Sequence, residues 1–397
     1  MTHVWKGASV TRLLPTEESV DLLAMVEEFA SAELAPRAAA DEAAAAFPRD
    51  ALRSLGDLGI LGLPFASSYG GGEQPYEVTL QALEEIARAW MSIGVSVSVH
   101  YLSCFPLAVY GTDEQRGRWL ADMVSGTLLG AYCLSEPQSG SDAAGLMTRA
   151  EPDDDGYRLT GTKAWITHGG RADFYSIMVR TSDDGARGIS CLLVDGATAG
   201  LSAAAPERKL GANASPTAQV LQDDVRVPAD RLMGAEGTGF TVALAALDAG
   251  RLGIAACGVG LAQAALDAAA AYAVDRRQFG RSIAEFQGIS FMLADMATAV
   301  AGARALYVEA ARLKDAGLPF GTVAAMAKLA ATDAAMRVTT DAIQVLGGAG
   351  YTQDFPVERY FREAKALQIV EGTNQIQRMV IGRALTRSRT GPRSPAS

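Results

Sequence analysis

The spacing of apolar residues changes twice along this chain of 397 residues. From about residue 15 to 128, apolar side chains recur every three or four positions, which is typical of amphipathic helices. Residues 129–236 instead contain short segments rich in aromatic and β-branched residues, separated by Asp/Gly clusters that suit hairpin turns. Helical spacing then returns and continues to about residue 388. Helices, strands and helices in succession favour an α+β fold over an alternating doubly wound sheet.

These changes divide the chain into predicted domains. We expect an N-terminal helical domain at residues 1–128, a central antiparallel β domain at 129–236, a C-terminal helical bundle at 237–388 and a flexible tail at 389–397. The expected strands are residues 157–166, 174–180, 188–194 and 218–227, and the expected long helices of the last domain are residues 237–278, 286–314, 323–346 and 374–385.

Composition excludes several classes of function. A net charge of -10 and a pI near 5.0 give a surface that repels phosphate backbones, so nucleic-acid binding is not expected. The four cysteines and three histidines are scattered, which indicates neither a disulfide framework nor a metal site. The N-terminus lacks a signal-peptide pattern, and the Ala-rich segments at 241–273 and 323–336 carry polar residues at intervals. We therefore predict a cytoplasmic protein with no membrane span.

Glycine motifs for nucleotide binding are missing. Gly258-Val259-Gly260 lies inside a helical pattern, and the sequence has no strand-GxGxxG-helix fingerprint, P-loop or GxSxG. This argues against a nicotinamide dehydrogenase of the Rossmann type.

Three segments carry groups suited to an anion or a planar ring. Residues 131–142 combine hydroxyls with small residues whose backbone N–H groups can face a ligand, although a polar interdomain turn would look the same. In residues 163–168, Trp165 and Thr167 would share one face of a strand, so that a ring could stack on the indole; packing in the core is the alternative. Residues 275–280 offer arginines for a pyrophosphate, or form a solvated helix end.

Glu371 is the candidate catalytic group. It follows two large apolar residues and precedes Gly372, a setting that should desolvate the carboxylate and raise its pKa, as a general base requires. Taken alone, the same pattern also fits an ordinary surface glutamate.

Together these segments resemble the acyl-CoA dehydrogenases, flavoenzymes that oxidise an acyl thioester to its trans-2-enoyl form. The resemblance covers residues 15–388 and rests on five segments in the family's order: SEPxxGSD at 135–142, WIT at 165–167, RRQFG at 276–280, QVLGG at 344–348 and EGTNQIQ at 371–377. The family's fold implies that the last domain is a four-helix bundle.

The resemblance also implies an FAD site between the last two domains and a neighbouring subunit of a homotetramer. The residues that match cofactor contacts are Tyr132, Leu134, Ser135, Ser141, Trp165, Thr167, Arg276, Gln278, Phe279, Gln287, Gln344, Gly347, Gly348, Thr373 and Gln375. The residues that match contacts to the acyl-CoA substrate are Ser141, Asp248, Arg251 and Gly372.

Glu371 matches the family's catalytic base. The resemblance implies that Glu371 removes the α-proton, that its N–H and a flavin ribityl hydroxyl stabilise the thioester enolate, and that flavin N5 accepts the β-hydride. Electrons would then pass to an electron-transferring flavoprotein. Three alternatives stay open: the same reaction on an acyl-carrier-protein thioester, an oxygen-using oxidase, and a flavin-binding assembly protein without catalysis.

Three positions depart from common patterns of the family. Gly250 stands where some members carry the base on an earlier helix, so Glu371 has no obvious rival. Val370 stands where tyrosine is frequent, and we expect it to alter the acyl cavity. His168 follows the WIT triplet and is expected to be a satisfied loop histidine.

Overall fold

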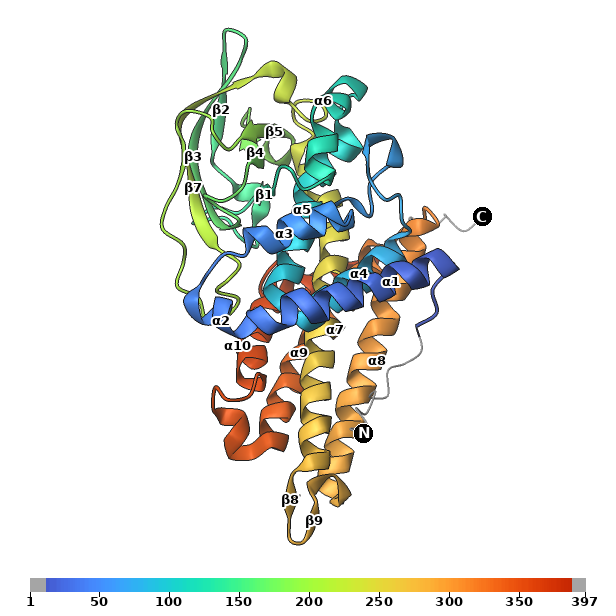
Figure 1. The fold of residues 1–397 in the computed structure, drawn as a ribbon. Coiled ribbons are helices and arrows are strands. Elements are labelled where there is room, and N and C mark those ends of the chain that lie inside the picture. The colour runs from blue at the N-terminus through green and yellow to red at the C-terminus, as the bar shows by residue number, and fades with distance from the viewer. Residues whose placement is uncertain (1–11, 388–397) are drawn as a thin grey trace, which may run out of the picture.

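The structure is a computed structural model that describes residues 12–387 (Figure 1). Its elements run in the order helices, strands, helices, which confirms the predicted α+β fold class. The predicted tail at residues 389–397 lies outside the described residues.

The N-terminal helices form a layer against the rest of the molecule. They are α1 (Glu17–Phe29), a π-helical turn (Ala30–Leu34), α2 (Ala35–Ala44), α3 (Arg49–Asp57), α4 (Tyr76–Ala89), α5 (Met91–Tyr110) and α6 (Asp113–Val124). Glu84 of α4 is buried and accepts hydrogen bonds from Arg304 of the C-terminal bundle, at 2.8 Å for the shortest, and from Tyr307. Burial opposes ionisation of Glu84, but Arg12 and Arg304 keep its pKa below the ordinary value, so the ionic contact fastens this layer to the bundle.

The central sheet contains seven strands. They are β1 (Gly130–Cys133), β2 (Arg149–Asp153), β3 (Gly156–Thr167), β4 (Phe174–Arg180), β5 (Ile189–Asp195), β6 (Leu201–Ala203) and β7 (Thr217–Pro228). Their order is β1-β4-β2-β3-β7-β6. Strand β5 lies off this path and pairs with β4. Most ladders are antiparallel, but β1 runs parallel to β4. The four predicted strands are present as β3, β4, β5 and β7, whereas β1, β2 and β6 were missed. All four residues of β1 are buried and show no alternation.

The C-terminal part is built around one long helix. It contains α7 (Gly239–Asp275), the hairpin strands β8 (Arg277–Gln278) and β9 (Arg281–Ser282), α8 (Gln287–Asp315), α9 (Gly321–Leu346), α10 (Val357–Leu367) and α11 (Asn374–Arg387). Helix α7 passes from the sheet to the far end of the molecule, where the β8–β9 hairpin protrudes (Figure 1). Glycines let other helices approach it: a Cβ on Gly260 would overlap the carbonyl oxygen of Glu84.

Within residues 12–387, three helices are long and apolar enough to cross a membrane by length and composition alone. They are α5, α7 and α8. In the most apolar stretch of each helix, 78% of the residues are buried inside the fold for α5 and for α7, but 22% for α8. Helices α5 and α7 are therefore core helices of this fold, as expected for the Ala-rich segment at 241–273. In helix α8 most residues of that stretch are at least partly exposed in the single chain.

Candidate active site

Glu371 occupies the turn between α10 and α11. Its φ of 53° is unusual for a residue with a side chain, and Gly372 follows with a φ of 84°. Both carboxylate oxygens are buried and, within the described residues, have no hydrogen-bond partner. A strained backbone that carries an unpaired buried carboxylate costs stability, so it points to a functional group rather than a structural one.

The surroundings of Glu371 set its ionisation. Burial raises the pKa of Glu371 to about 7, against the opposing positive charges of Arg251 and Lys328. A carboxylate with that pKa is partly ionised at neutral pH and holds a proton firmly once it has taken one. The sequence prediction of a raised pKa agrees with this environment.

Buried side chains from α9 and α11 fix the turn. Lys328 Nζ donates to the carbonyl oxygen of Gly372 at 3.0 Å and to Asn374 Oδ1 at 2.8 Å. Gln377 Nε2 donates to the same carbonyl at 2.8 Å. Burial lowers the pKa of Lys328 to about 8, with Glu371 acting in the opposite direction. Sequence reasoning missed Lys328, which appears only as one cation in an Ala-rich helix, and gave no role to Asn374 and Gln377 although both lie in the EGTNQIQ segment.

Helix α7 supplies the opposite wall. A Cβ on Gly250 would overlap Glu371 Oε2, so the glycine is what lets the carboxylate approach this helix. Arg251 is 6% exposed and forms an ion pair with Asp248, and its Nε is buried without a partner among the described residues. Burial raises the pKa of Asp248, opposed by Arg251. The structure thus brings three of the predicted positions, Glu371, Asp248 and Arg251, into one region.

The end of β1 lies within electrostatic range of Glu371. Tyr132 is buried, its Oη has no partner among the described residues, and its pKa is raised by burial first and then by Cys191 and Glu371. Leu134 is buried, Ser135 is half-buried and Ser141 is exposed. Among these side chains, Tyr132 carries the hydroxyl that is buried without a partner in the described residues.

A buried ion pair shapes the loop that follows. Lys163 Nζ donates to Glu136 Oε1 at 2.8 Å and to the carbonyl oxygen of Leu134 at 3.2 Å. Glu136 also accepts from the backbone N–H groups of Met147 (2.6 Å) and Thr148 (2.9 Å). Burial disfavours the charge of Glu136, but Lys163 and these donors hold its pKa at about 2. Sequence reasoning gave no role to this pair.

Strand β3 is distorted at Trp165. Its pairing with β7 shifts between Lys163 and Ile166, and Trp165 has a φ of 62°. The indole is 64% exposed, which rules out the alternative of a core tryptophan. The bulge also interrupts the simple alternation that was expected to place Trp165 and half-buried Thr167 on one face. Ala164 N–H donates to the carbonyl oxygen of Ser135 at 2.9 Å, so the 131–142 and 163–168 segments lie side by side.

The two histidines of the described chain hold the start of β1. Gly130 N–H donates to His100 Nδ1 at 3.1 Å, and His168 Nδ1 donates to Gly130 O at 2.9 Å. His168 is only half satisfied, because its buried Nε2 has no partner among the described residues. Burial lowers the pKa of both rings to about 4.

Comparison with known proteins identifies the family of this chain. Three family models match in succession: the N-terminal domain of acyl-CoA dehydrogenase at residues 16–127, the middle domain at 131–225 and the C-terminal domain at 237–386. The chain belongs to the acyl-CoA dehydrogenase family. As a member it is an FAD-dependent oxidoreductase of the acyl-CoA dehydrogenase type.

Members of this family are similar to this chain over nearly their full length. An acyl-CoA dehydrogenase of Bacillus subtilis (strain 168) is 44% identical over 93% of this chain and 98% of its own. The structure of butyryl-CoA dehydrogenase from Megasphaera elsdenii has a TM-score of 0.92 at 39% identity, covering 94% of this chain and 99% of that one. A structure described as the electron transferring flavoprotein of Acidaminococcus fermentans has a TM-score of 0.93 at 41% identity, covering 95% and 100%.

The residues at the end of the sheet fit the FAD on which acyl-CoA dehydrogenases depend. The exposed Trp165 ring and the unpaired Tyr132 hydroxyl leave a flat apolar surface and a polar group without partners from this chain. Other predicted cofactor contacts lie elsewhere in the chain. Arg276, Gln278 and Phe279 are exposed on or beside the β8–β9 hairpin, at the opposite end of the molecule from the sheet, and Gln287, Gln344, Gly347, Gly348 and Gln375 are exposed on other elements (Figure 1). Thr373 is half-buried, and its Oγ1 accepts from Ile376 N–H at 3.3 Å.

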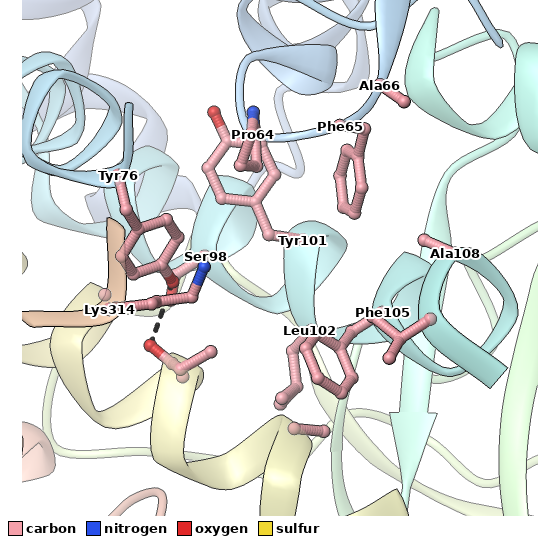
Figure 2. A pocket seen from close by; sticks show the side chains of 15 residues that line it. Pro64, Phe65, Ala66, Tyr76, Ser98, Tyr101, Leu102, Phe105, Ala108 and Lys314 are labelled. Carbon is pink, nitrogen blue, oxygen red and sulfur yellow. Dashed lines mark hydrogen bonds between the residues drawn. The ribbon is translucent and has the colours of Figure 1, made fainter. Parts of the chain in front are cut away.

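A cavity adjoins the catalytic region of this acyl-CoA dehydrogenase. Its volume is about 200 Å³, and Gly250, the neighbour of the Glu371 carboxylate, is part of its wall (Figure 2). The remaining wall comes from the 64–66 loop and from α4, α5, α7 and the end of α8. Val370 is 37% exposed and does not line this cavity, so the effect expected of it on the acyl cavity stays a prediction.

Proposed function

We propose that this protein oxidises an acyl-CoA to the trans-2-enoyl-CoA with Glu371 as the base that removes the α-proton. The observation that carries the proposal is the carboxylate of Glu371: it is buried, unpaired, poised by a pKa of about 7 and directed at Gly250 in the wall of the cavity. No other carboxylate in the described residues combines an unpaired buried side chain with a place beside that cavity.

Residues of this chain supply the acid–base part of the reaction. The α-proton of a thioester is too weakly acidic for a carboxylate in water, so the developing enolate needs donors in a site without water. The N–H of Glu371 has no acceptor in the described chain and is free to donate to the thioester carbonyl. The positive charges of Arg251 and Lys328 favour the ionised base. FAD, when bound, supplies the acceptor for the β-hydride.

We further propose how the cofactor is held. Tyr132, Leu134, Ser135, Ser141, Trp165 and Thr167 would contact the flavin portion from the central domain (residues 129–236). FAD would thus lie between this domain and the bundle 237–388, and the helical domain 1–128 would not hold it. The β8–β9 hairpin lies at the opposite end of the molecule from the sheet (Figure 1). This separation supports a site in which Arg276, Gln278 and Phe279 contact the FAD of a neighbouring subunit. The 93% exposed Phe279 and the 59% exposed Phe291 support association with further copies of this chain, which we propose to be a homotetramer. We propose a cytoplasmic location from the sequence.

The remaining partners follow from the same proposal. Asp248, Arg251, Ser141 and Gly372 would contact the CoA thioester. An electron-transferring flavoprotein would accept the electrons, which the similarity to the Acidaminococcus fermentans structure supports.

Anaerobic mixing of the purified holoenzyme with a panel of acyl-CoAs tests the reaction. Loss of the oxidised flavin absorbance is expected with at least one acyl-CoA, and Glu371→Gln should abolish that loss while retaining its FAD. If no acyl-CoA bleaches the bound flavin, the proposal is wrong for CoA thioesters, and the same assay with acyl-carrier-protein thioesters decides between a carrier substrate and no catalysis. Peroxide formation in air distinguishes an oxidase from a dehydrogenase.

A further inference from the structure

The cavity beside Gly250 is small for a ligand site. Its volume of about 200 Å³ lies below the range of roughly 300 to 1,000 Å³ that is usual for pockets holding whole small molecules. Such a space suits one part of a ligand. How far an acyl chain can extend from the catalytic carboxylate therefore depends on whether the walls can move.

Tyr76 forms one wall at the start of α4. Its ring is 7% exposed, and its hydroxyl donates to the carbonyl oxygen of Ala249 at 3.0 Å, next to Gly250 (Figure 2). Lys314, which also lines the cavity, lies over the ring with Nζ 4.1 Å from the ring centroid. Moving this ring away would leave its buried hydroxyl unpaired, so Tyr76 is a fixed wall.

Tyr101 forms a second wall on α5. It is 7% exposed, its hydroxyl donates to the carbonyl oxygen of Ile60, and its ring packs edge-on against Phe65 with centroids 6.0 Å apart. The same hydrogen-bond argument fixes this ring. In Figure 2, Tyr76 and Tyr101 stand on one side of the cavity, with Phe105 and Ala108 across from them.

The cavity does not continue between helices α4, α5 and α7. A Cβ on Gly253 of α7 would overlap Ser98 Oγ of α5 and would lie 3.6 Å from Leu83 Cδ2 of α4. The three helices therefore meet at this point with no space for methylene groups between them.

From these walls we infer that the substrate carries a short acyl group such as butyryl, and that Tyr76 and Tyr101 set the length limit. The inference rests on the proposed function. An octanoyl or palmitoyl chain would have to displace a hydrogen-bonded tyrosine or separate α5 from α7 at Gly253. Each added methylene beyond the limit thus lowers kcat/KM instead of raising it.

The test compares butyryl-, octanoyl- and palmitoyl-CoA with the wild-type holoenzyme and with Tyr101→Leu. We expect the wild type to prefer butyryl-CoA over palmitoyl-CoA by about 100-fold in kcat/KM. Tyr101→Leu should raise the ratio of octanoyl- to butyryl-CoA activity by about tenfold. Tyr157→Leu removes a partly buried tyrosine ring from β3, outside the cavity, and should leave that ratio unchanged.

If Tyr101→Leu does not fold, Tyr76→Leu is a second variant that enlarges the same cavity. Equal activity of the wild type on butyryl- and palmitoyl-CoA would overturn the inference while leaving the dehydrogenase function intact. An unchanged length ratio in both tyrosine variants would overturn the role of these residues. Absence of flavin reduction by every acyl-CoA would instead count against the proposed function itself.

Discussion

Replacing Glu371 with glutamine should make the protein more stable, and the gain should grow with pH. The pKa of Glu371 is raised by burial to about 7, against an ordinary value near 4.5. In the unfolded chain the carboxyl loses its proton at a lower pH than in the folded protein. Ionisation therefore stabilises the unfolded state, and folding stability falls as the pH rises from about 4.5 to about 7. A shift of about 2.5 pKa units at about 1.4 kcal/mol each makes the full cost about 3 kcal/mol.

Glutamine removes this cost because it has no charge to desolvate. Relative to wild type, the free energy of unfolding of Glu371→Gln should be higher by about 1 kcal/mol at pH 5 and about 3 kcal/mol at pH 8. The measurement is urea unfolding of the two holoenzymes, at saturating FAD and one protein concentration, followed at pH 5, 6, 7 and 8.

Glu136→Gln is the matched control, because the pKa of Glu136 is held at about 2. Ionisation of Glu136 stabilises the fold above pH 4.5, so its loss should cost about 3 kcal/mol at every pH from 5 to 8. A Glu371→Gln variant that is less stable than wild type at pH 8, or whose difference does not change with pH, would refute the reasoning about the base.

The other predictions concern the same region. Below about pH 7, kcat/KM should fall by about tenfold per pH unit as Glu371 takes up a proton, which a pH–rate profile measures. Gly250→Ala should displace the Glu371 carboxylate and lower the rate of flavin reduction by about 100-fold without loss of FAD, as stopped-flow absorbance would show. Lys163→Met should weaken FAD binding about tenfold in a fluorescence titration, because it releases Leu134 and Glu136. Since burial lowers the pKa of His100 and His168 to about 4, each should cost about 3 kcal/mol of folding stability as pH falls from 6.5 to 4, and a shallow unfolding curve against pH would contradict this.

The sequence predicted elements well where one periodicity lasted long enough. Helix α9 was expected at residues 323–346 and is observed at Gly321–Leu346, because a long apolar stripe and the Gly347-Gly348 stop signal agree. Strand β4 matches its predicted residues 174–180. Helix α10 was missed, since it has 11 residues and lies between two turns. The parallel pairing of β1 with β4 follows from tertiary contacts that no local pattern records.

Candidate site residues were predictable by type but not by partner. Glu371 stood out from its apolar neighbours, yet the cation that fixes its turn, Lys328, lies 43 residues earlier in a helix that looks like ordinary core. Likewise Lys163 and Glu136 find each other only through the fold. Assignments of individual residues to FAD, such as Arg276 and Gln287, stay predictions because they depend on a second subunit.

The turn at Glu371 lowers the stability of the fold through its backbone conformation and its buried carboxylate. A left-handed φ of 53° at a glutamate costs of order 1–3 kcal/mol, in addition to the charge burial estimated above. Lys328 and Gln377 offset part of that cost by donating to the carbonyl oxygen of Gly372, and Lys328 also donates to Asn374 Oδ1, while the carboxylate itself has no partner among the described residues. A structural glutamate would be expected to accept one of these donors. The carboxylate that lacks a partner in this turn is the group that we propose exchanges a proton with the substrate.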